Sequence, residues 1–222
     1  MIRKIAIFWS LLLLILVISG LSDHVCNVRL SESDITRYRH VHRLSSYDEL
    51  FREMGSKHNI DWRMLAAIAH VESRFRPHST SYAGAIGMMQ IMPRVARAMG
   101  VEPIKLYNAE LNVDLSCQIL NSIDKILRFD KYILPRDRRA LILASYNGGI
   151  GHILDARRLA KAMGGDGNSW SDVSRALSVK NDSEHQSTVH VRNGRLSGVR
   201  YILRYVDDVL AKYDEYCAAV VL

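Results

Sequence analysis

Apolar residues recur at spacings of three and four along most of the 222-residue chain, and strand-like alternation is nearly absent. This periodicity predicts a mainly α-helical fold. We expect helices that begin near Tyr47, Trp62, Leu111, Pro135, Trp170 and Val199. The first apolar stripe stops at Gly55, which is expected to end its helix, and Asp61 is placed to cap the second helix.

The second expected helix, from Trp62 to about Glu72, carries very little polar surface. Its apolar positions include Met64, Leu65, Ile68, Ala69 and Val71. A helix that is apolar around most of its circumference is buried in a core. Glu72 is therefore expected at the end of a buried element.

Residues 47–217 are expected to form one helical domain, without an internal repeat or a second domain. The stretch 23–46 is polar and charged, which is typical of a linker. Between Gly164 and Gly194 the sequence turns rich in glycine, serine, asparagine and aspartate, around one short helix at 170–177. A loop of this length is usually functional or disordered.

The first 22 residues have the layout of a secretory signal. Two basic residues, Arg3 and Lys4, precede an apolar run at 5–18, and the small residues Gly20 and Ser22 follow. The run is shorter than the roughly 20 apolar residues that span a bilayer. Cleavage near Ser22 is therefore favoured, with retention of 1–22 as a membrane anchor as the alternative. Either outcome places the chain in the periplasm or elsewhere in the cell envelope.

Three cysteines leave further alternatives open. Cys26 lies just past the signal and would allow lipid attachment to a membrane, although Val25 precedes it where a bacterial lipidation signal usually has a small residue. Cys117 and Cys217 would meet an oxidising compartment after export, which permits a disulfide. Cys117 also lies in an apolar helical stretch, and we favour its interpretation as a small buried residue.

The chain is basic, with a formal net charge of +7 and an isoelectric point near 9.4. Its basic residues are scattered, and no nucleic-acid motif or aromatic stacking pattern accompanies them, so nucleic acid is not an expected partner. An anionic polymer outside the cytoplasm fits better, because a positive field raises its local concentration. Peptidoglycan, whose stem peptides carry carboxylates, is one such polymer.

Glu72 is the first candidate for chemistry. A carboxyl group at the end of an apolar helix loses hydration, and this raises its pKa into the range of a proton donor near neutral pH. Glycosidase acids need such an environment. The alternative, given equal weight, is a surface residue that pairs with Arg74 or Arg76.

Two further segments carry groups suited to sugar binding. In residues 81–93, glycines permit a flat ligand to approach the backbone, and Gln90 offers both a donor and an acceptor. In residues 144–149, Tyr146 offers a ring for stacking and Asn147 an amide. The alternatives are a tight turn whose methionines fill core gaps, and a helix end with a packed tyrosine.

We expect no metal and no cofactor. His70 and Glu72 form an H-x-E string, but residues two apart on a helix do not face each other, and the C-x-x-C partner of a zinc deaminase is missing. H-E-x-x-H, G-x-S-x-G and P-loop motifs do not occur either. Asp114 and Glu110, on an amphipathic helix, are interpreted as solvated.

These segments, taken in order, resemble the motifs of lytic transglycosylases that share the lysozyme-like domain of soluble lytic transglycosylases and goose-type lysozymes. Glu72-Ser73 matches the first motif, E-S at a helix end. Gly87 to Pro93 matches G-x-M-Q followed by I-M-P, and Ala144 to Asn147 matches A-Y-N with one residue inserted. The resemblance covers about 47–216 and looks most like the catalytic module of the membrane-bound type F members. It implies a lysozyme-like single domain of packed helices with a long loop after the third motif.

The resemblance also implies a mechanism in which Glu72 acts twice. As an acid it protonates the oxygen between N-acetylmuramic acid and N-acetylglucosamine, and as a base it takes the proton from the muramic acid C6 hydroxyl. The product is a 1,6-anhydro end, and no water is consumed. Positions that match the family's substrate contacts are Ser73, Ser81, Gly87, Met89, Gln90, Tyr146, Asn147 and Tyr201.

One departure from the family pattern concerns the closing helix. Tyr201 matches the closing tyrosine, but the glutamate that often precedes it by four residues would fall at Ser197, so the resemblance does not extend to a second acidic contact. Two other functions stay open on the same fold. One is a lysozyme-type muramidase that hydrolyses the bond, and the other is a non-catalytic module for peptidoglycan binding or secretion assembly.

Overall fold

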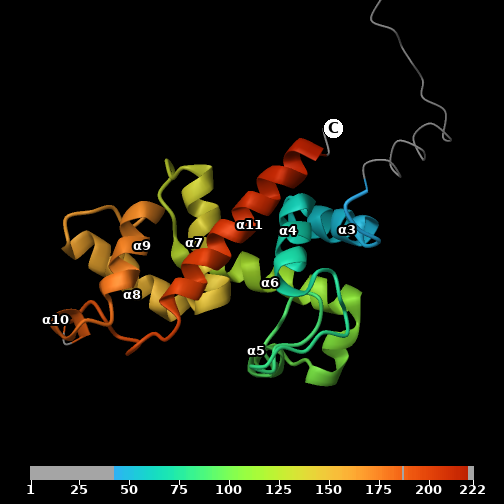
Figure 1. The fold of residues 1–222 in the computed structure, drawn as a ribbon, viewed down its shortest axis with the longest axis horizontal. Helices are drawn as coiled ribbons and strands as arrows, with labels where there is room; N and C mark the ends of the chain where they lie inside the picture. The colour runs from blue at the N-terminus through green and yellow to red at the C-terminus, as the bar shows by residue number, and fades with distance from the viewer. Residues whose placement is uncertain (1–42, 187, 220–222) are drawn as a thin grey trace, which may run out of the picture. The chain divides into compact units, whose positions relative to one another are not determined.

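The computed structural model describes residues 43–186 and 188–219. The expected signal segment, Cys26 and most of the expected linker lie outside these residues. The described elements are α3 (Asp48–His58), α4 (Trp62–Ser73), α5 (Pro93–Ala98), the 3-10 helix η1 (Pro103–Tyr107), α6 (Ala109–Leu127), α7 (Pro135–Gly148), α8 (Ile150–Ala162), α9 (Trp170–Val179), α10 (Ser183–Gln186) and α11 (Val199–Ala219), as Figure 1 shows. Within this part of the chain only isolated β-bridges occur besides helices, which confirms the mainly α prediction.

At the junction between α3 and α4, the structure agrees with the predicted start of α4 but not with the predicted end of α3. The Asp61 carboxylate caps α4 by accepting a hydrogen bond from the Arg63 backbone N–H at 3.0 Å, as expected. The prediction that α3 ends at Gly55 was wrong, because the helix continues to His58 and ends at Asn59 in the left-handed conformation. Gly55 instead permits close packing, since a Cβ there would lie 2.6 Å from the Ile60 carbonyl oxygen.

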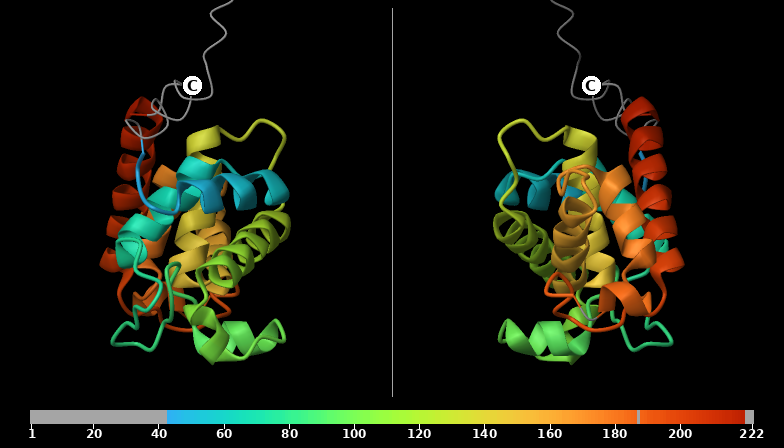
Figure 2. Two further views of the ribbon diagram at one scale, coloured as in Figure 1. Left: turned by 90° about the vertical axis from the view of Figure 1, so that its right-hand side faces the viewer. Right: turned by 90° about the vertical axis from the view of Figure 1, so that its left-hand side faces the viewer.

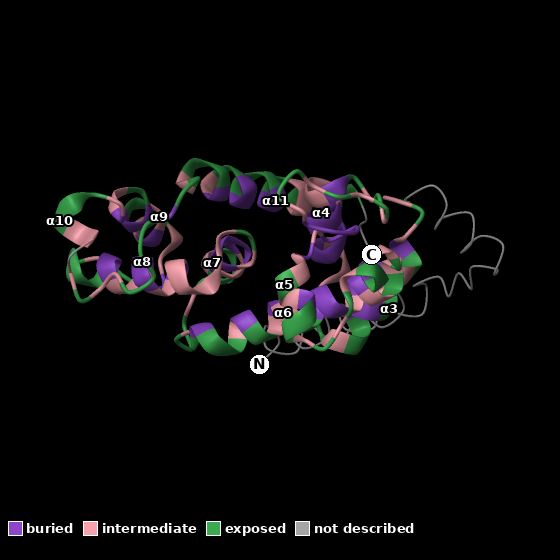
Figure 3. Cartoon of the chain, turned by 90° about the horizontal axis from the view of Figure 1, so that it is seen from below, coloured by how far each residue is buried: buried purple, intermediate pink, exposed green. Residues whose placement is uncertain are grey.

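Helix α4 is the centre of the core. The five consecutive residues from Leu65 to Ala69 are fully buried, and Figure 3 shows the burial running along most of the helix. Helix α11 lies across α4 and α7, and contributes Ile202, Val206 and Val209 to the same core. Burial of each large aliphatic side chain contributes about 1.5–3 kcal/mol to stability. The end of α4 that carries Glu72 is therefore firmly held.

The segment 164–194 is more ordered than its composition indicates. Helix α9 begins at Trp170, as predicted, with the Ser169 hydroxyl as its cap. Its residues Val173, Ala176 and Leu177 are fully buried, and α9 packs against α8. The sequence analysis expects no helix at α8, where Gly148, Gly149 and Gly151 are typical of a break in the chain. The break is confined to Gly149, which has a φ of +89°.

Two further elements complete the arrangement. Figure 2 shows the segment from α5 to η1 lying below the other described helices, connected to α4 by the loop 74–92. Cys117 is fully buried in α6, which confirms its interpretation as a core residue, and neither Cys117 nor Cys217 forms a disulfide. None of the helices in the described ranges is both long and apolar enough to cross a bilayer.

Candidate active site

Glu72 occupies the last turn of α4, two residues before the left-handed cap residue Arg74. Its side chain is largely buried, and burial raises the pKa of its carboxyl group to about 7, although the nearby Tyr205 hydroxyl acts to lower it. The alternative of a surface carboxylate paired with arginine does not occur. Arg74 is exposed, and Arg76 donates its Nε to the Ser73 carbonyl oxygen at 2.8 Å.

Tyr205, on α11, is the residue beside Glu72 that the sequence reading missed. It is 8% exposed, and its hydroxyl has no partner in good hydrogen-bond geometry among the described residues. Burial raises the pKa of Tyr205 well above its ordinary value, and the charge of Glu72 raises it further. The phenol therefore stays protonated, and its only role toward the carboxylate is that of a hydrogen-bond donor.

Tyr146, near the end of α7, is also close enough to Glu72 to sense its charge. Its hydroxyl donates to the Met89 carbonyl oxygen at 2.8 Å and shares a 3.2 Å hydrogen bond with the Ser116 hydroxyl. Burial raises the pKa of Tyr146, and the nearby charge of Glu72 adds to the effect. The third motif thus reaches the site and also supports the loop that carries the second motif.

The loop that carries the second motif, within residues 74–92, has a backbone conformation that few residue types adopt. Gly87 has a φ of +87°, and a Cβ there would lie 2.3 Å from Asn112 Nδ2 and 2.4 Å from the Leu106 carbonyl oxygen. Gln90 has a φ of +52° and donates its Nε2 to the Gly87 carbonyl oxygen at 2.8 Å. This bond fixes the amide and leaves its oxygen without a partner in the described chain, so that it can accept from a ligand.

Three of the expected substrate contacts instead hold the loop together. Ser73 is 2% exposed, and its hydroxyl donates to the Met88 carbonyl oxygen at 2.8 Å. Met89 is fully buried, and its backbone N–H donates to Asn112 Oδ1 at 2.7 Å. The Ser81 hydroxyl accepts from the Ala85 N–H at 2.9 Å. The side chains of Ser73 and Met89 face the interior, and a contact of these two positions with substrate stays a prediction.

Asn112 is a second functional residue that the sequence reading missed. It is fully buried in α6, accepts the Met89 N–H and donates its Nδ2 to the Ile86 carbonyl oxygen at 3.1 Å. These bonds satisfy backbone groups that would otherwise be buried without partners. The remaining expected contacts, Asn147 and Tyr201, are exposed, the latter at 79%.

The site has one carboxyl group with a raised pKa. No second carboxylate contributes to the pKa shift of Glu72, and the described part of the chain holds no cluster of three or more metal-ligating side chains.

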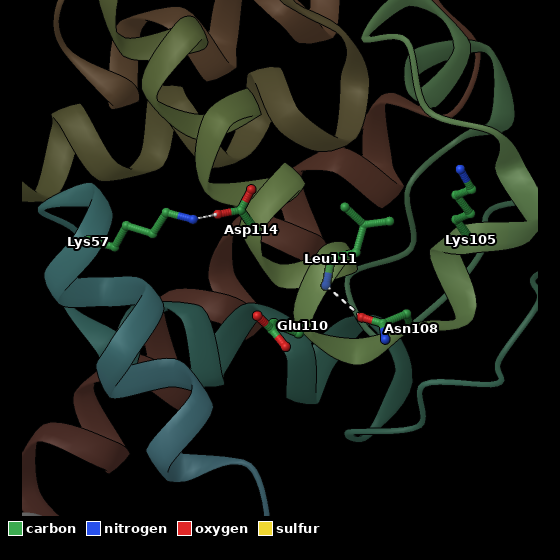
Figure 4. Close-up of a pocket in the computed structure, with 6 residues that line it drawn as sticks. All are labelled: Lys57, Lys105, Asn108, Glu110, Leu111 and Asp114. Carbon is green, nitrogen blue, oxygen red and sulfur yellow. Dashed lines mark hydrogen bonds and ion pairs between the residues drawn. The ribbon is translucent and has the colours of Figure 1, made fainter.

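Asp114 lines a separate open pocket of about 530 Å³ between α3 and α6, shown in Figure 4. Its expected solvation is corrected, because it pairs with Lys57 at 2.6 Å and His58 at 2.9 Å. Burial acts to raise the pKa of Asp114, but these hydrogen bonds and one from Gln118 outweigh it and lower the value to about 2.

Comparison with known proteins gives a consistent picture. Residues 49–167 match the family model of the transglycosylase SLT domain. The membrane-bound lytic murein transglycosylase F of Desulfosudis oleivorans is 33% identical over 78% of this chain and 36% of its own length. The protein of the same name from Thiobacillus denitrificans is 36% identical over 85% of this chain and 40% of its own length. The chain thus spans less than half the length of these relatives.

Two solved structures share the fold. The 70 kDa soluble lytic transglycosylase of Escherichia coli superposes on 78% of this chain and 24% of its own, with a TM-score of 0.50 and 24% identity. An inactive variant of the lytic transglycosylase Slt of Pseudomonas aeruginosa gives a TM-score of 0.52 at 17% identity, over the same shares of the two chains. At these identities the likeness concerns the fold alone, and it confirms the lysozyme-like domain that the motifs imply.

Proposed function

Because this chain belongs to the transglycosylase SLT family, we propose that it cleaves the glycan strands of peptidoglycan without water, and that Glu72 is the single acid and base. The observation that carries the proposal is the setting of Glu72. Its carboxyl group has a pKa of about 7, two protonated tyrosines interact with it, and no second carboxylate contributes to its pKa.

In the first step Glu72 acts as an acid. With a pKa near 7, a large fraction of the carboxyl groups hold a proton at neutral pH, which an ordinary glutamate does not. The proton passes to the oxygen that links N-acetylmuramic acid to N-acetylglucosamine, and the bond from this oxygen to C1 of the muramic acid breaks. The leaving group departs as a neutral alcohol.

In the second step the same group acts as a base. The carboxylate accepts the proton of the C6 hydroxyl while O6 bonds to C1, so that a 1,6-anhydro ring forms and Glu72 regains its proton. A hydrolase of the usual kind needs a second carboxylate to activate water or to attack C1. This mechanism needs only one, in keeping with the site.

Other residues orient the sugar. The free amide oxygen of Gln90 is suited to accept from a sugar hydroxyl or an acetamido N–H, and Asn147 offers an exposed amide. The Tyr205 hydroxyl is suited to donate to Glu72 in its carboxylate state. The exposed ring of Tyr201 offers a surface for stacking against a strand.

The substrate and the names of the relatives favour action in the cell envelope. Relatives named membrane-bound lytic murein transglycosylase F share about a third of their residues with this chain over the aligned parts. Together with the secretory layout of residues 1–22, this supports an exported protein that acts at the wall. Membrane attachment, through retention of 1–22 or a lipid on Cys26, is the alternative to cleavage near Ser22.

The direct experiment is replacement of Glu72. Glu72→Gln should abolish release of soluble fragments from purified peptidoglycan while binding to the strands persists. Glu102→Gln, which changes an exposed glutamate of the same chain, is the matched control and should cleave normally. Unchanged turnover by Glu72→Gln would exclude the proposed role, and binding without turnover by the native chain would indicate a non-catalytic module.

A further inference from the structure

Lys180 is a buried lysine that the proposed cleavage does not use. It follows α9 directly, and its side chain is fully buried. An ammonium group has three protons to donate and cannot accept a hydrogen bond. Three acceptors surround it: the Gly194 carbonyl oxygen, the Asp155 carboxylate at 3.4 Å and Nδ1 of His152 at 3.3 Å. Lys180 is thus hydrogen-bonded to Gly194 and His152 and forms an ion pair with Asp155.

This arrangement fixes the proton of His152. Since Lys180 can only donate, Nδ1 of His152 must be the acceptor, and the single proton of the neutral ring lies on Nε2. Burial lowers the pKa of His152, the charge of Lys180 lowers it further, and Asp155 opposes both. No hydrogen bond joins Asp155 to the His152 ring among the described residues; the Asp155 oxygens accept from Arg158 and Asn193.

The other edge of the His152 ring lies near Gly149, two residues after the third motif. His152 lies in the first turn of α8, three residues after Gly149, and a Cβ on Gly149 would lie 4.0 Å from His152 Cδ2, the carbon bonded to Nε2. Nε2 has no hydrogen-bond partner among the described residues. An unpartnered nitrogen that is not buried must be exposed, and Nε2 is not one of the buried atoms, so it is open to solvent. A fixed N–H donor thus lies near Gly149, shortly after the Tyr146-Asn147 segment.

We propose that His152 is a further substrate-binding residue, whose Nε2–H donates to a carbonyl or carboxylate oxygen of the peptidoglycan strand, and that Lys180 is the positioning residue that sets its tautomer. The inference rests on the proposed function. The ammonium group draws electron density through Nδ1, and hydrogen bonds in such a chain strengthen one another. This makes the Nε2–H a better donor without placing a second positive charge on the ring. The acceptor is either a sugar acetamido group or a stem-peptide group, which share this chemistry.

The tautomer is tested without any activity. In the full chain labelled with ¹⁵N-histidine, His152 is assigned by the loss of its signals in His152→Gln. The expected spectrum has a protonated Nε2 and an unprotonated Nδ1 at neutral pH, and this pattern persists below the pH at which an ordinary histidine takes a second proton. A proton on Nδ1 would overturn the proposal. In Lys180→Met, if it folds, Nδ1 should lose its bonded signature.

Substrate binding is measured in a Glu72→Gln background, where strands are not cut. Loss of one hydrogen bond to the ligand should weaken binding about threefold to tenfold in His152→Leu. His152→Gln keeps an N–H donor near the position of Nε2 and should restore most of the affinity. In otherwise native protein, His152→Leu should raise KM and leave kcat nearly unchanged.

The outcomes separate this inference from the proposed function. An equal loss on strands with and without stem peptides assigns the acceptor to the sugar, and a loss only with stems assigns it to the peptide. Equal affinity of His152→Leu and the parent for both substrates would refute the role of His152 and leave the cleavage chemistry intact. Continued cleavage by Glu72→Gln would instead refute the proposed function, whatever His152 does.

Discussion

Ionisation of Glu72 should make the protein less stable as the pH rises, and Glu72→Gln should remove that dependence. The pKa of the carboxyl group is raised from 4.5 to about 7 on folding. Between these two values the unfolded chain binds fewer protons than the folded chain, so stability falls with increasing pH. The contribution of the protonated group is complete below about pH 4.5 and is lost as the pH rises through about 7.

The size of the stability difference follows from the pKa shift of Glu72. At about 1.4 kcal/mol per pKa unit, the change from 4.5 to about 7 corresponds to about 3 kcal/mol between the two protonation states. A domain is typically stable by only about 5–15 kcal/mol, so this is a large fraction. Glutamine has nearly the same shape and no charge. Glu72→Gln should therefore match the native protein near pH 4 and exceed its stability by about 3 kcal/mol near pH 8.

Urea unfolding at a series of pH values measures the difference, provided that the dependence on urea concentration is the same for both proteins. Glu102→Gln serves as the control, because it makes the same chemical change at an exposed glutamate. A gap between Glu72→Gln and native protein that stays constant from about pH 4 to pH 8 would refute the reasoning, because the carboxyl group would then have its ordinary pKa.

Three other changes test separate parts of the structure. Tyr205→Phe removes the hydroxyl that lowers the pKa of Glu72, so the alkaline limb of the pH–activity profile should move to higher pH and kcat should fall; an unmoved limb would contradict this contact. Asp114→Asn removes a group whose pKa is lowered from 3.8 to about 2, so unfolding experiments should show a loss of stability above about pH 4 that disappears as the pH falls through about 2. Gly87→Ala should cost at least about 1–2 kcal/mol from its left-handed backbone alone, and the clash with Asn112 should also abolish cleavage; a stable, active variant would contradict the close packing of the loop.

Much of the fold follows from local sequence signals. The start of α4 at Trp62 and the start of α9 at Trp170 were predictable because each has a side-chain cap directly before an apolar periodic segment. The end of α3 was not, because a glycine that permits two helices to approach closely looks the same in sequence as a glycine that ends a helix. Gly55 is of the first kind, since its neighbours are Ile60 and Trp62.

The candidate active site was also predictable only in part from the sequence. A raised pKa for Glu72 was predictable, because one apolar helix removes most of the water around its last turn. The neighbours of Glu72 come from distant parts of the chain. The motif comparison singled out Tyr201 in this helix, whereas the tyrosine beside Glu72 is Tyr205, one turn later. The buried position of Tyr205 was signalled by its spacing of three residues after Ile202, another residue on the apolar face of α11.

The role of Asn112 had a weaker signal. It is a polar residue beside the apolar stripe of α6, and such a position is as common on a helix flank as in a core. Only the loop packed against α6 shows why an amide is needed there, because two backbone groups at Met89 and Ile86 require it. Loop backbone of this kind is specified by tertiary contacts and cannot be read from periodicity.

The measurement that tests the central claim most directly is digestion of peptidoglycan in ¹⁸O-labelled water, followed by mass spectrometry of the released fragments. If Glu72 alone carries the proton to the bridge oxygen and receives one from the C6 hydroxyl, the new muramic acid ends are 1,6-anhydro rings without ¹⁸O. Reducing ends that carry ¹⁸O at C1 would show that water is the nucleophile and would contradict the mechanism.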